Sequence, residues 1–98
     1  MHKYELGIIL FPQLEEEAVK AEHAWLTELI ERFGGKIEKV DNWGKRKLAY
    51  EINKLNEGHY CFFYIDAPAE MPAQLEERMR IRESLMRHLI LRRDDLEA

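Results

Sequence analysis

The stretch "HYCFFYID", residues 59–66, decides the fold, because it contains the longest apolar run of the chain. Successive side chains of a β-strand point to opposite faces. One face would carry Tyr60, Phe62 and Tyr64, and the other Cys61, Phe63 and Ile65. A strand that is apolar on both faces is typical of the interior of a sheet. The stretch therefore predicts a buried strand, and the rest of the chain has to supply its neighbours.

Periodicity and breakers predict those neighbours. Apolar spacings of three and four predict helices, alternation predicts strands, and proline and glycine mark the ends. The predicted elements are a strand at 3–11, a helix at 14–33, a strand at 36–52 bent around 41–44, a turn at 53–58, the strand at 59–66, a connection at 67–72, a helix at 71–82 and a strand at 85–92. The order β-α-β-β-α-β predicts an α+β, ferredoxin-like fold, a four-stranded antiparallel sheet with both helices on one face.

The same patterns predict which side chains are buried. The first strand alternates, with Tyr4, Leu6, Ile8 and Leu10 on one face. The first helix is expected to bury Leu14, Ala18, Ala21, Trp25, Leu26, Leu29, Ile30 and Phe33, and the second Met71, Leu75 and Met79. Because 98 residues suffice for one core, we expect a single domain at 1–93 and a short charged tail at 94–98.

Composition limits the setting of the protein. No apolar run approaches the roughly 20 residues that cross a bilayer, so no membrane association is expected. The N-terminus lacks the small-residue cleavage site of a signal peptide. Cys61 is the single cysteine, which excludes an internal disulfide and favours a reducing, cytoplasmic location.

Charge is distributed unevenly. The net charge is −4, but six of the eight arginines follow residue 77, and Lys45, Arg46 and Lys47 are adjacent. Alternation after this basic run places Leu48, Tyr50 and Ile52 on one face, which we expect to anchor the basic rim to the core. An acidic chain with a local positive surface favours a defined docking site over general coating of nucleic acid.

Catalytic and metal-binding patterns are absent from the sequence. The four histidines lack metal-ligand spacing, and one cysteine cannot form a CxxC pair. Ser84 and Thr27 are the only serine and threonine, and Thr27 is expected in the middle of a helix between Leu26 and Glu28. Cys61 is interpreted as a small core residue, and His88 as a strand histidine. We expect no cofactor, no metal, no small-molecule substrate and no enzyme activity.

The aromatic strand suggests a binding surface. Only one of its faces can meet the helices, so the other should be an exposed aromatic surface. RNA-recognition domains stack bases on such a face, although a partner protein or a second copy would also cover it. The RNP1-type pattern of those domains is absent, which disfavours their mode of base stacking. Trp43 lies at the bend of a predicted edge strand, where an interface and core packing remain equal alternatives.

The stretch "WGKRKLAYEI" (43–52) resembles the signature of the bacterial small-subunit ribosomal protein S six (S6) family: a glycine, a short basic stretch, Leu-Ala-Tyr, any residue and Ile. Further matches in register are "KYE" (3–5), "FGGKIEKV" (33–40), "EGHYCFFYI" (57–65) and "RIRESLMRHLILR" (80–92). The resemblance covers residues 3–93 without gaps. Glu51 stands where members commonly have proline.

The resemblance implies the ferredoxin-like fold and a non-catalytic role. It implies a heterodimer with ribosomal protein S eighteen (S18) that binds the central domain of small-subunit ribosomal RNA. The motif positions carried over are Tyr4, Arg46, Tyr50, Arg80 and Arg87; Lys3, Lys45, Lys47, Arg92 and Arg93 are added on charge alone. All of these except Tyr50 are expected RNA contacts. The expected partner contacts are Trp43, Leu48, Tyr50, Tyr60 and Phe62.

An enzyme of similar fold is the main alternative. Small homodimeric monooxygenases pair open ferredoxin-like sheets around an aromatic pocket, which Trp43, Tyr60 and Phe62 could supply. The arginine-rich C-terminal part and the lack of a polar catalytic set disfavour this alternative. A regulatory ligand-binding domain would need a glycine-rich loop after the first strand, and residues 11–14 do not supply one.

Overall fold

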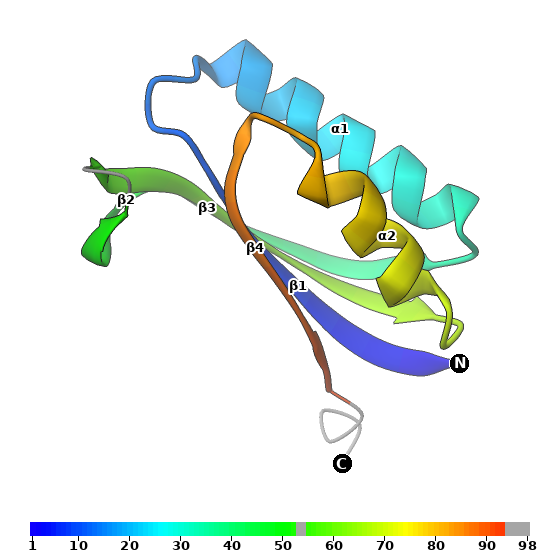
Figure 1. Ribbon diagram of the computed structural model, residues 1–98. Coiled ribbons are helices and arrows are strands. Elements are labelled where there is room, and N and C mark those ends of the chain that lie inside the picture. The colour runs from blue at the N-terminus through cyan, green and yellow to red at the C-terminus, as the bar shows by residue number, and fades with distance from the viewer. Residues whose placement is uncertain (53–54, 94–98) are drawn as a thin grey trace.

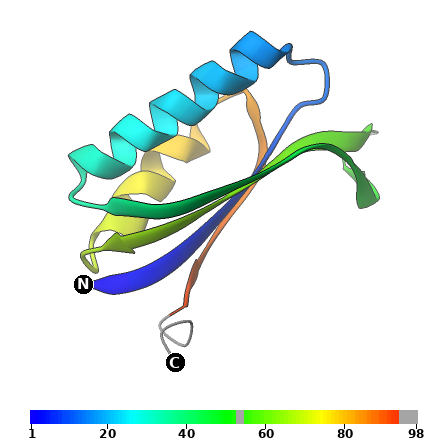
Figure 2. The ribbon, with the colours of Figure 1, turned by 180° about the vertical axis from the view of Figure 1, so that it is seen from behind.

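The computed structural model describes residues 1–52 and 55–93, and for residues 49, 50 and 52 the backbone alone. The elements in chain order are β1 (His2–Leu10), α1 (Glu16–Arg32), β2 (Lys36–Ile52), β3 (Leu55–Ala67), α2 (Met71–Arg80) and β4 (Leu85–Arg92). The strands form one sheet in the order β2-β3-β1-β4, and all neighbouring pairs are antiparallel. Both helices lie on the same face of the sheet (Figure 1 and Figure 2). The predicted ferredoxin-like plan is confirmed.

The hydrophobic core lies between the helices and one face of the two central strands. From the sheet it receives Tyr4, Leu6, Ile8 and Leu10, the alternating set predicted for the first strand, and Cys61, Phe63 and Ile65, one of the two faces that alternation defined for β3. From the helices it receives, among others, Leu26, Leu29, Ile30, Met71, Leu75 and Met79. Phe63 is fully buried at the centre, and its neighbours along β3, Phe62 and Tyr64, are only half-buried. The sheet therefore has one closed face and one open face.

The predicted burial of α1 is partly wrong. Val19 and Glu22 are buried, whereas Ala21 is exposed. Leu26, Leu29 and Ile30 fix the rotation of the helix, because their large side chains gain most from burial. The same stripe extended backwards at helical spacing falls on Glu22 and Val19. An acidic residue therefore occupies an inward position, where it needs a partner.

The predicted turn at 53–58 is also wrong from Leu55 onward, because β3 begins there. Gly58 pairs with Arg46, Glu57 with Lys47, and Leu55 with Ile52. Glycine and polar residues favoured a turn, but strand pairing satisfies their backbone groups without one. The paired ends of β2 and β3 project beyond the end of β1 (Figure 1). Residues 53 and 54 lie outside the described residues.

Candidate nucleic-acid and partner interface

The open face of the sheet collects the alternate residues that the helices do not cover. β3 contributes Tyr60, Phe62 and Tyr64, which the register places opposite Ile9, Gly7 and Glu5 of β1. β4 adds Arg87, Leu89 and Leu91 opposite the same β1 residues. Leu89 is 58% exposed, although it is a large apolar side chain in a regular strand. The exposed aromatic surface that the alternation predicted is therefore present, and it extends across three strands.

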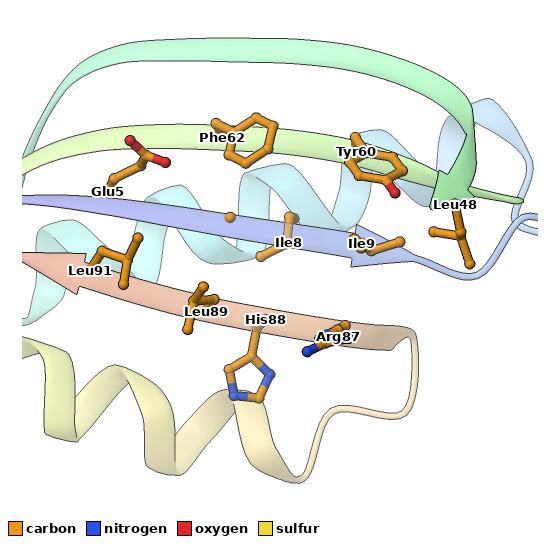
Figure 3. Close-up of a pocket in the computed structure, with 11 residues that line it drawn as sticks. Glu5, Ile8, Ile9, Leu48, Tyr60, Phe62, Arg87, His88, Leu89 and Leu91 are labelled. Carbon is orange, nitrogen blue, oxygen red and sulfur yellow. The ribbon is translucent and has the colours of Figure 1, made fainter. Parts of the chain in front are cut away.

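A shallow groove of about 280 Å³ runs across this face. Its walls are mainly apolar side chains, and Glu5 and Arg87 lie at its margins (Figure 3). The apolar lining includes Ile9, Leu48, Tyr60, Phe62, Leu89 and Leu91. The groove draws on β1, β2, β3 and β4, so all four strands must be in place to form it. An apolar concave surface with few charges suits an apolar protein segment better than phosphate.

Gly7 lets the aromatic layer lie directly on the sheet. A Cβ added at Gly7 would stand 2.9 Å from Cε1 of Phe62, closer than carbon atoms pack. Phe62 is the register partner of Gly7, so its ring lies across the glycine position. Glycine inside a strand often marks such a close approach. The depth of the groove beside Phe62 therefore depends on the missing side chain at residue 7.

The predicted bend of β2 is a bulge at residues 42–44. The β2–β3 register shifts between Asn42 and Gly44, and Gly44 has φ +74°. The Gly44 N–H donates to Asn42 Oδ1 at 3.1 Å. Asparagine side chains commonly stabilise turns in this way, and glycine adopts positive φ without a Cβ penalty. The bulge is thus built from side-chain and backbone features that are readable in the sequence.

The bulge brings Trp43 onto the aromatic residues of the open face. Its ring stacks on Tyr60 with centroids 6.1 Å apart and meets Phe62 edge-on at 4.9 Å. Trp43 nevertheless stays 45% exposed. Of the two alternatives left open for this residue, core packing is therefore wrong. Trp43 belongs to the open face, together with two of the other predicted partner contacts.

Leu48 does not reach the core, contrary to our expectation for the strand that follows the basic run. It is half-buried, and it lines the groove on the open face beside Tyr60 and Ile9 (Figure 3). Beyond the bulge at 42–44, Gly44 and Arg46 lie opposite Tyr60 and Gly58, so Leu48, two residues further along, faces the open side, and the end of β2 curls over the sheet. Leu48 thus joins the predicted partner contacts of the open face. The side chains of Tyr50 and Ile52 lie outside the described residues.

All of the predicted basic residues except Arg80 lie at two opposite ends of the sheet. Lys45 pairs with His59, and His59 pairs with Leu10 at the end of β1. Arg87 pairs with Ile9 in the same region. Lys45, Arg46, Lys47 and Arg87 are all exposed, and they form what we call the hairpin end. Lys3, Arg92 and Arg93 lie where β1 begins and β4 ends, and we call this the terminal end.

Positive charges at the terminal end are matched by acceptors. Lys3 Nζ lies 2.7 Å from Asp66 Oδ1, and this hydrogen bond holds the pKa of the Asp66 carboxyl below its usual value. Arg93 Nη1 lies 3.0 Å from Glu5 Oε1. Arg92 Nη2 lies 2.7 Å from Nδ1 of His2. In these three predicted RNA contacts, a neighbouring group therefore neutralises the positive charge or accepts one of the hydrogen bonds that a phosphate would accept.

The remaining predicted RNA contacts are dispersed. Tyr4 is 6% exposed and belongs to the core, so its ring is not accessible to RNA, and we do not retain it as a contact. The family motif placed Tyr4 on the RNA, but its face of β1 meets the helices. Arg80 is exposed at the last residue of α2, in the helix layer rather than on the open face. The nine expected RNA contacts thus do not form one continuous patch.

A partly buried charge cluster lies outside this surface, and the sequence analysis missed it. Arg82 donates to both carboxylate oxygens of Glu22, at 2.9 and 2.7 Å, and Ser84 Oγ donates to Oε1. Arg82 also lies over the ring of Trp25 at 4.2 Å. These bonds, chiefly that from Arg82, hold the pKa of Glu22 below its usual value. The sequence did contain a signal for this cluster, because Glu22 stands at helical spacing between Val19 and Leu26, which are both buried.

Other polar groups have structural roles. Cys61 is fully buried, and burial raises the pKa of its thiol to about 11, so it stays protonated. His88 pairs with Glu76 at 2.9 Å. Within residues 1–52 and 55–93, no three of the His, Cys, Asp and Glu side chains gather as they would around a metal ion. Over the same part of the chain, no helix has the length and apolar character needed to span a bilayer.

Comparison with known proteins decides the family. The model of the family described as ribosomal protein S6 matches residues 3–92, nearly the whole chain. The chain belongs to the ribosomal protein S6 family. Curated relatives carry the name small ribosomal subunit protein bS6. One from Clostridium kluyveri is 47% identical over 92 residues, covering 94% of this chain and 97% of the relative. One from Clostridium acetobutylicum is 45% identical over 91 residues, covering 93% and 96%.

A solved structure agrees with the fold. The crystal structure of 30S ribosomal protein S6 from Thermotoga maritima superimposes with a TM-score of 0.93 at 36% identity. The match covers 98% of this chain and 91% of that one. The resemblance carried by residues 43–52 and the later motifs is therefore confirmed. Membership of the S6 family implies a structural protein of the small ribosomal subunit and disfavours the monooxygenase alternative.

Proposed function

We propose that the chain is a cytoplasmic component of the small ribosomal subunit that binds the central domain of small-subunit ribosomal RNA together with S18. The observation that carries this proposal, beside the family, is that one sheet presents two chemically different surfaces. Its open face has an apolar groove, and its hairpin end is basic. Two such surfaces suit two partners, one a protein and the other RNA.

The apolar groove is the proposed S18 site. Trp43, Leu89 and Leu91 are large apolar side chains with 41% to 58% of their surface exposed. Covering them removes apolar surface from water, at roughly 25 cal/mol per Å². Trp43, Leu48, Tyr60 and Phe62 surround or adjoin the groove, which supports four of the five expected partner contacts. The fifth, Tyr50, stays a prediction.

The hairpin end is the proposed RNA site. Lys45, Arg46, Lys47 and Arg87 bring four positive charges to one end of the sheet. Lys45, Arg46 and Lys47 form no ion pair within the described residues. Such charges release counterions from RNA phosphates on binding, so the affinity should fall steeply as salt rises. An overall charge of −4 repels RNA elsewhere on the molecule and so favours one orientation.

A salt titration of RNA binding tests both halves of the proposal. Binding to a central-domain fragment is measured at several salt concentrations, with and without S18. We expect tight, salt-dependent binding that requires S18. Binding that is equally tight without S18 would remove the partner from the proposal. A chain that binds neither RNA nor S18, and that forms a stable homodimer through its open sheet, would return the enclosed-pocket enzyme to first place.

A matched pair of variants tests the groove. Leu89→Ser replaces a 58% exposed leucine of the groove wall, whereas Ile81→Ser replaces a 79% exposed isoleucine at the end of α2. Both changes remove an exposed aliphatic side chain, so their effects on solubility and stability should be similar. We expect Leu89→Ser to weaken S18 binding about tenfold and Ile81→Ser to leave it unchanged. Equal affinities of the two variants for S18 would place the partner elsewhere.

A further inference from the structure

The bulge of β2 connects the aromatic part of the open face to its basic end. Asn42 and Gly44 form the bulge through the bond from the Gly44 N–H to Asn42 Oδ1. Trp43 between them packs on Tyr60 and Phe62, so its ring is fixed by two aromatic contacts. Its backbone carbonyl is directed by the same bulge. The ring and the backbone of Trp43 therefore both have a defined position, although β2 is an edge strand of the sheet.

Arg46 is held by both parts of Trp43. Its Nε donates to the Trp43 carbonyl oxygen at 3.1 Å. Its guanidinium carbon lies 5.6 Å from the centre of the Trp43 ring, within the range of a cation–π contact. Two contacts of different kinds thus restrain the end of a side chain that is exposed to solvent. Within the described residues Arg46 makes no ion pair, so its charge is not neutralised there.

The neighbouring lysines lack this restraint. Lys45 and Lys47 are exposed, and neither side chain makes a hydrogen bond, an ion pair or a ring contact within the described residues. A lysine that binds a phosphate must lose the freedom of its four-carbon stem at that moment. Arg46 has already lost part of this freedom in the free protein. The basic run of three residues therefore contains one cation held by two contacts and two cations that no such contact restrains within the described residues.

We propose that the Asn42–Gly44 bulge is a device that orients Arg46 toward an RNA phosphate, and that Trp43 is its positioning residue. This inference rests on the proposed function. Arg46 uses Nε for the protein, and its two terminal nitrogens remain to bind phosphate oxygens. Arginine presents these donors in a rigid plane that matches two phosphate oxygens, which lysine cannot reproduce. Arg46 would thus fix the register of the RNA, while Lys45 and Lys47 supply charge alone.

Nuclear magnetic resonance of the free protein measures the positioning directly. The Nε–H group of Arg46 should exchange slowly with water and show restricted motion, and both properties should be lost in Trp43→Leu. The matched control is Tyr64→Leu, which removes the ring beneath Lys39, 5.7 Å away, elsewhere on the open face. That variant should leave the Arg46 signal unchanged. Trp43 is exposed enough for the Leu variant to fold, and a melting curve verifies this.

A double-mutant cycle connects positioning to RNA binding. Affinity for the central-domain fragment is measured with saturating S18 for the wild type, Trp43→Leu, Arg46→Lys and the double variant. We expect Trp43→Leu to weaken binding about threefold and Arg46→Lys about fivefold, with the double variant no weaker than Arg46→Lys. All four proteins keep their charge, so their salt slopes should agree. Arg46→Ala alone should lower the slope by about one.

The outcomes separate this inference from the proposed function. A wild type that does not bind RNA in the presence of S18 overturns both. RNA binding by the wild type with additive losses in the cycle shows that Trp43 acts independently of Arg46 and overturns the positioning role alone. An Arg46 Nε–H signal that is unchanged in Trp43→Leu does the same. Non-additive losses, together with a released Arg46 signal, support the proposal.

Discussion

Two neighbouring phenylalanines of β3 lie on opposite faces of the sheet and have different surroundings. Phe63 is fully buried under the helices, whereas Phe62 is half-buried on the opposite face, beside Trp43. They are adjacent in the sequence and chemically identical, so their difference comes entirely from which face of the sheet the helices cover. The closed face stabilises the fold, and the open face is available for partners. Each variant below tests this division of roles.

The largest effect is expected at the centre of the closed face. Phe63→Ala should lower the free energy of unfolding by about 3–5 kcal/mol, because it removes a large buried side chain and leaves a cavity. Phe62→Ala is the matched variant on the open face and should cost about 1 kcal/mol. Urea denaturation of both proteins measures the contrast. Similar losses for the two variants would mean that the open face contributes to the fold as much as the core does.

The second effect concerns the polar contact that holds the loop after α2 to α1. Glu22→Ala leaves Arg82 and Ser84 without their shared acceptor. Breaking a fully buried ion pair costs about 3–5 kcal/mol, but Arg82 is 37% exposed, so we expect about 2 kcal/mol. Glu22→Gln keeps the shape without the charge and should lose less. Melting temperatures at neutral pH compare the three proteins.

The pH dependence of that loss has a definite sign. The pKa of Glu22 is lower in the folded chain than its ordinary value of 4.5. The carboxylate therefore contributes its stabilisation fully above pH 4.5, and the contribution disappears as the pH falls through the folded pKa. The difference in unfolding free energy between wild type and Glu22→Gln should be constant near neutral pH and shrink in acid. A difference that grows in acid would contradict the assigned ion pair.

Some of this architecture could be predicted from the sequence and some could not. Alternation in 59–66 and helical spacing in 71–79 fixed the elements, and Asn42 with Gly44 marked the bulge, because all three signals are local. Both faces of β3 are equally apolar, so the sequence alone did not show which one the helices cover. The Glu22–Arg82 pair joins residues 60 positions apart. Such a contact exists only once α1 and the end of α2 have packed.

The same reasoning applies to the candidate site. The aromatic and basic residues were predicted from composition and the family motif, but their grouping was not. Leu48 was expected in the core and lies over the groove, because the bulge at 42–44 changes which residues of β2 face the open side. Lys3 and Lys47 looked equivalent on charge. Only the position of Asp66 opposite Lys3 distinguishes them.

A smaller effect is expected at Gly7, where the Phe62 ring lies directly over the strand. Gly7→Ala places a Cβ 2.9 Å from the Phe62 ring, which must move outward. We expect about 1 kcal/mol of destabilisation, the lower range for overpacking, because the half-buried ring can shift. The shifted ring should narrow the groove and weaken S18 binding more than it weakens folding. Calorimetric titration with S18 measures this, and combining Gly7→Ala with Phe62→Leu should restore binding by making room for the Cβ.

The smallest effects on stability are expected for two lysine variants, one at the hairpin end of the sheet and one at the terminal end. Lys47→Ala should lower the slope of the logarithm of RNA affinity against the logarithm of salt concentration by about one unit, because one phosphate contact is lost. Lys3→Ala removes the same charge at the terminal end. There Asp66 lies 2.7 Å from the ammonium and already neutralises it, so the slope should stay unchanged.

Folding stability provides the control for that last comparison. Lys47→Ala removes no ion pair within the described residues, so its free energy of unfolding should match that of the wild type. Lys3→Ala breaks a partly exposed pair and should cost less than about 1 kcal/mol. Lys47→Ala should therefore have the larger effect on RNA binding, and Lys3→Ala the larger effect on stability, although both variants remove one positive charge. If Lys3→Ala lowered the salt slope as much as Lys47→Ala does, RNA would contact both ends of the sheet, and the Asp66 pair would have to open on binding.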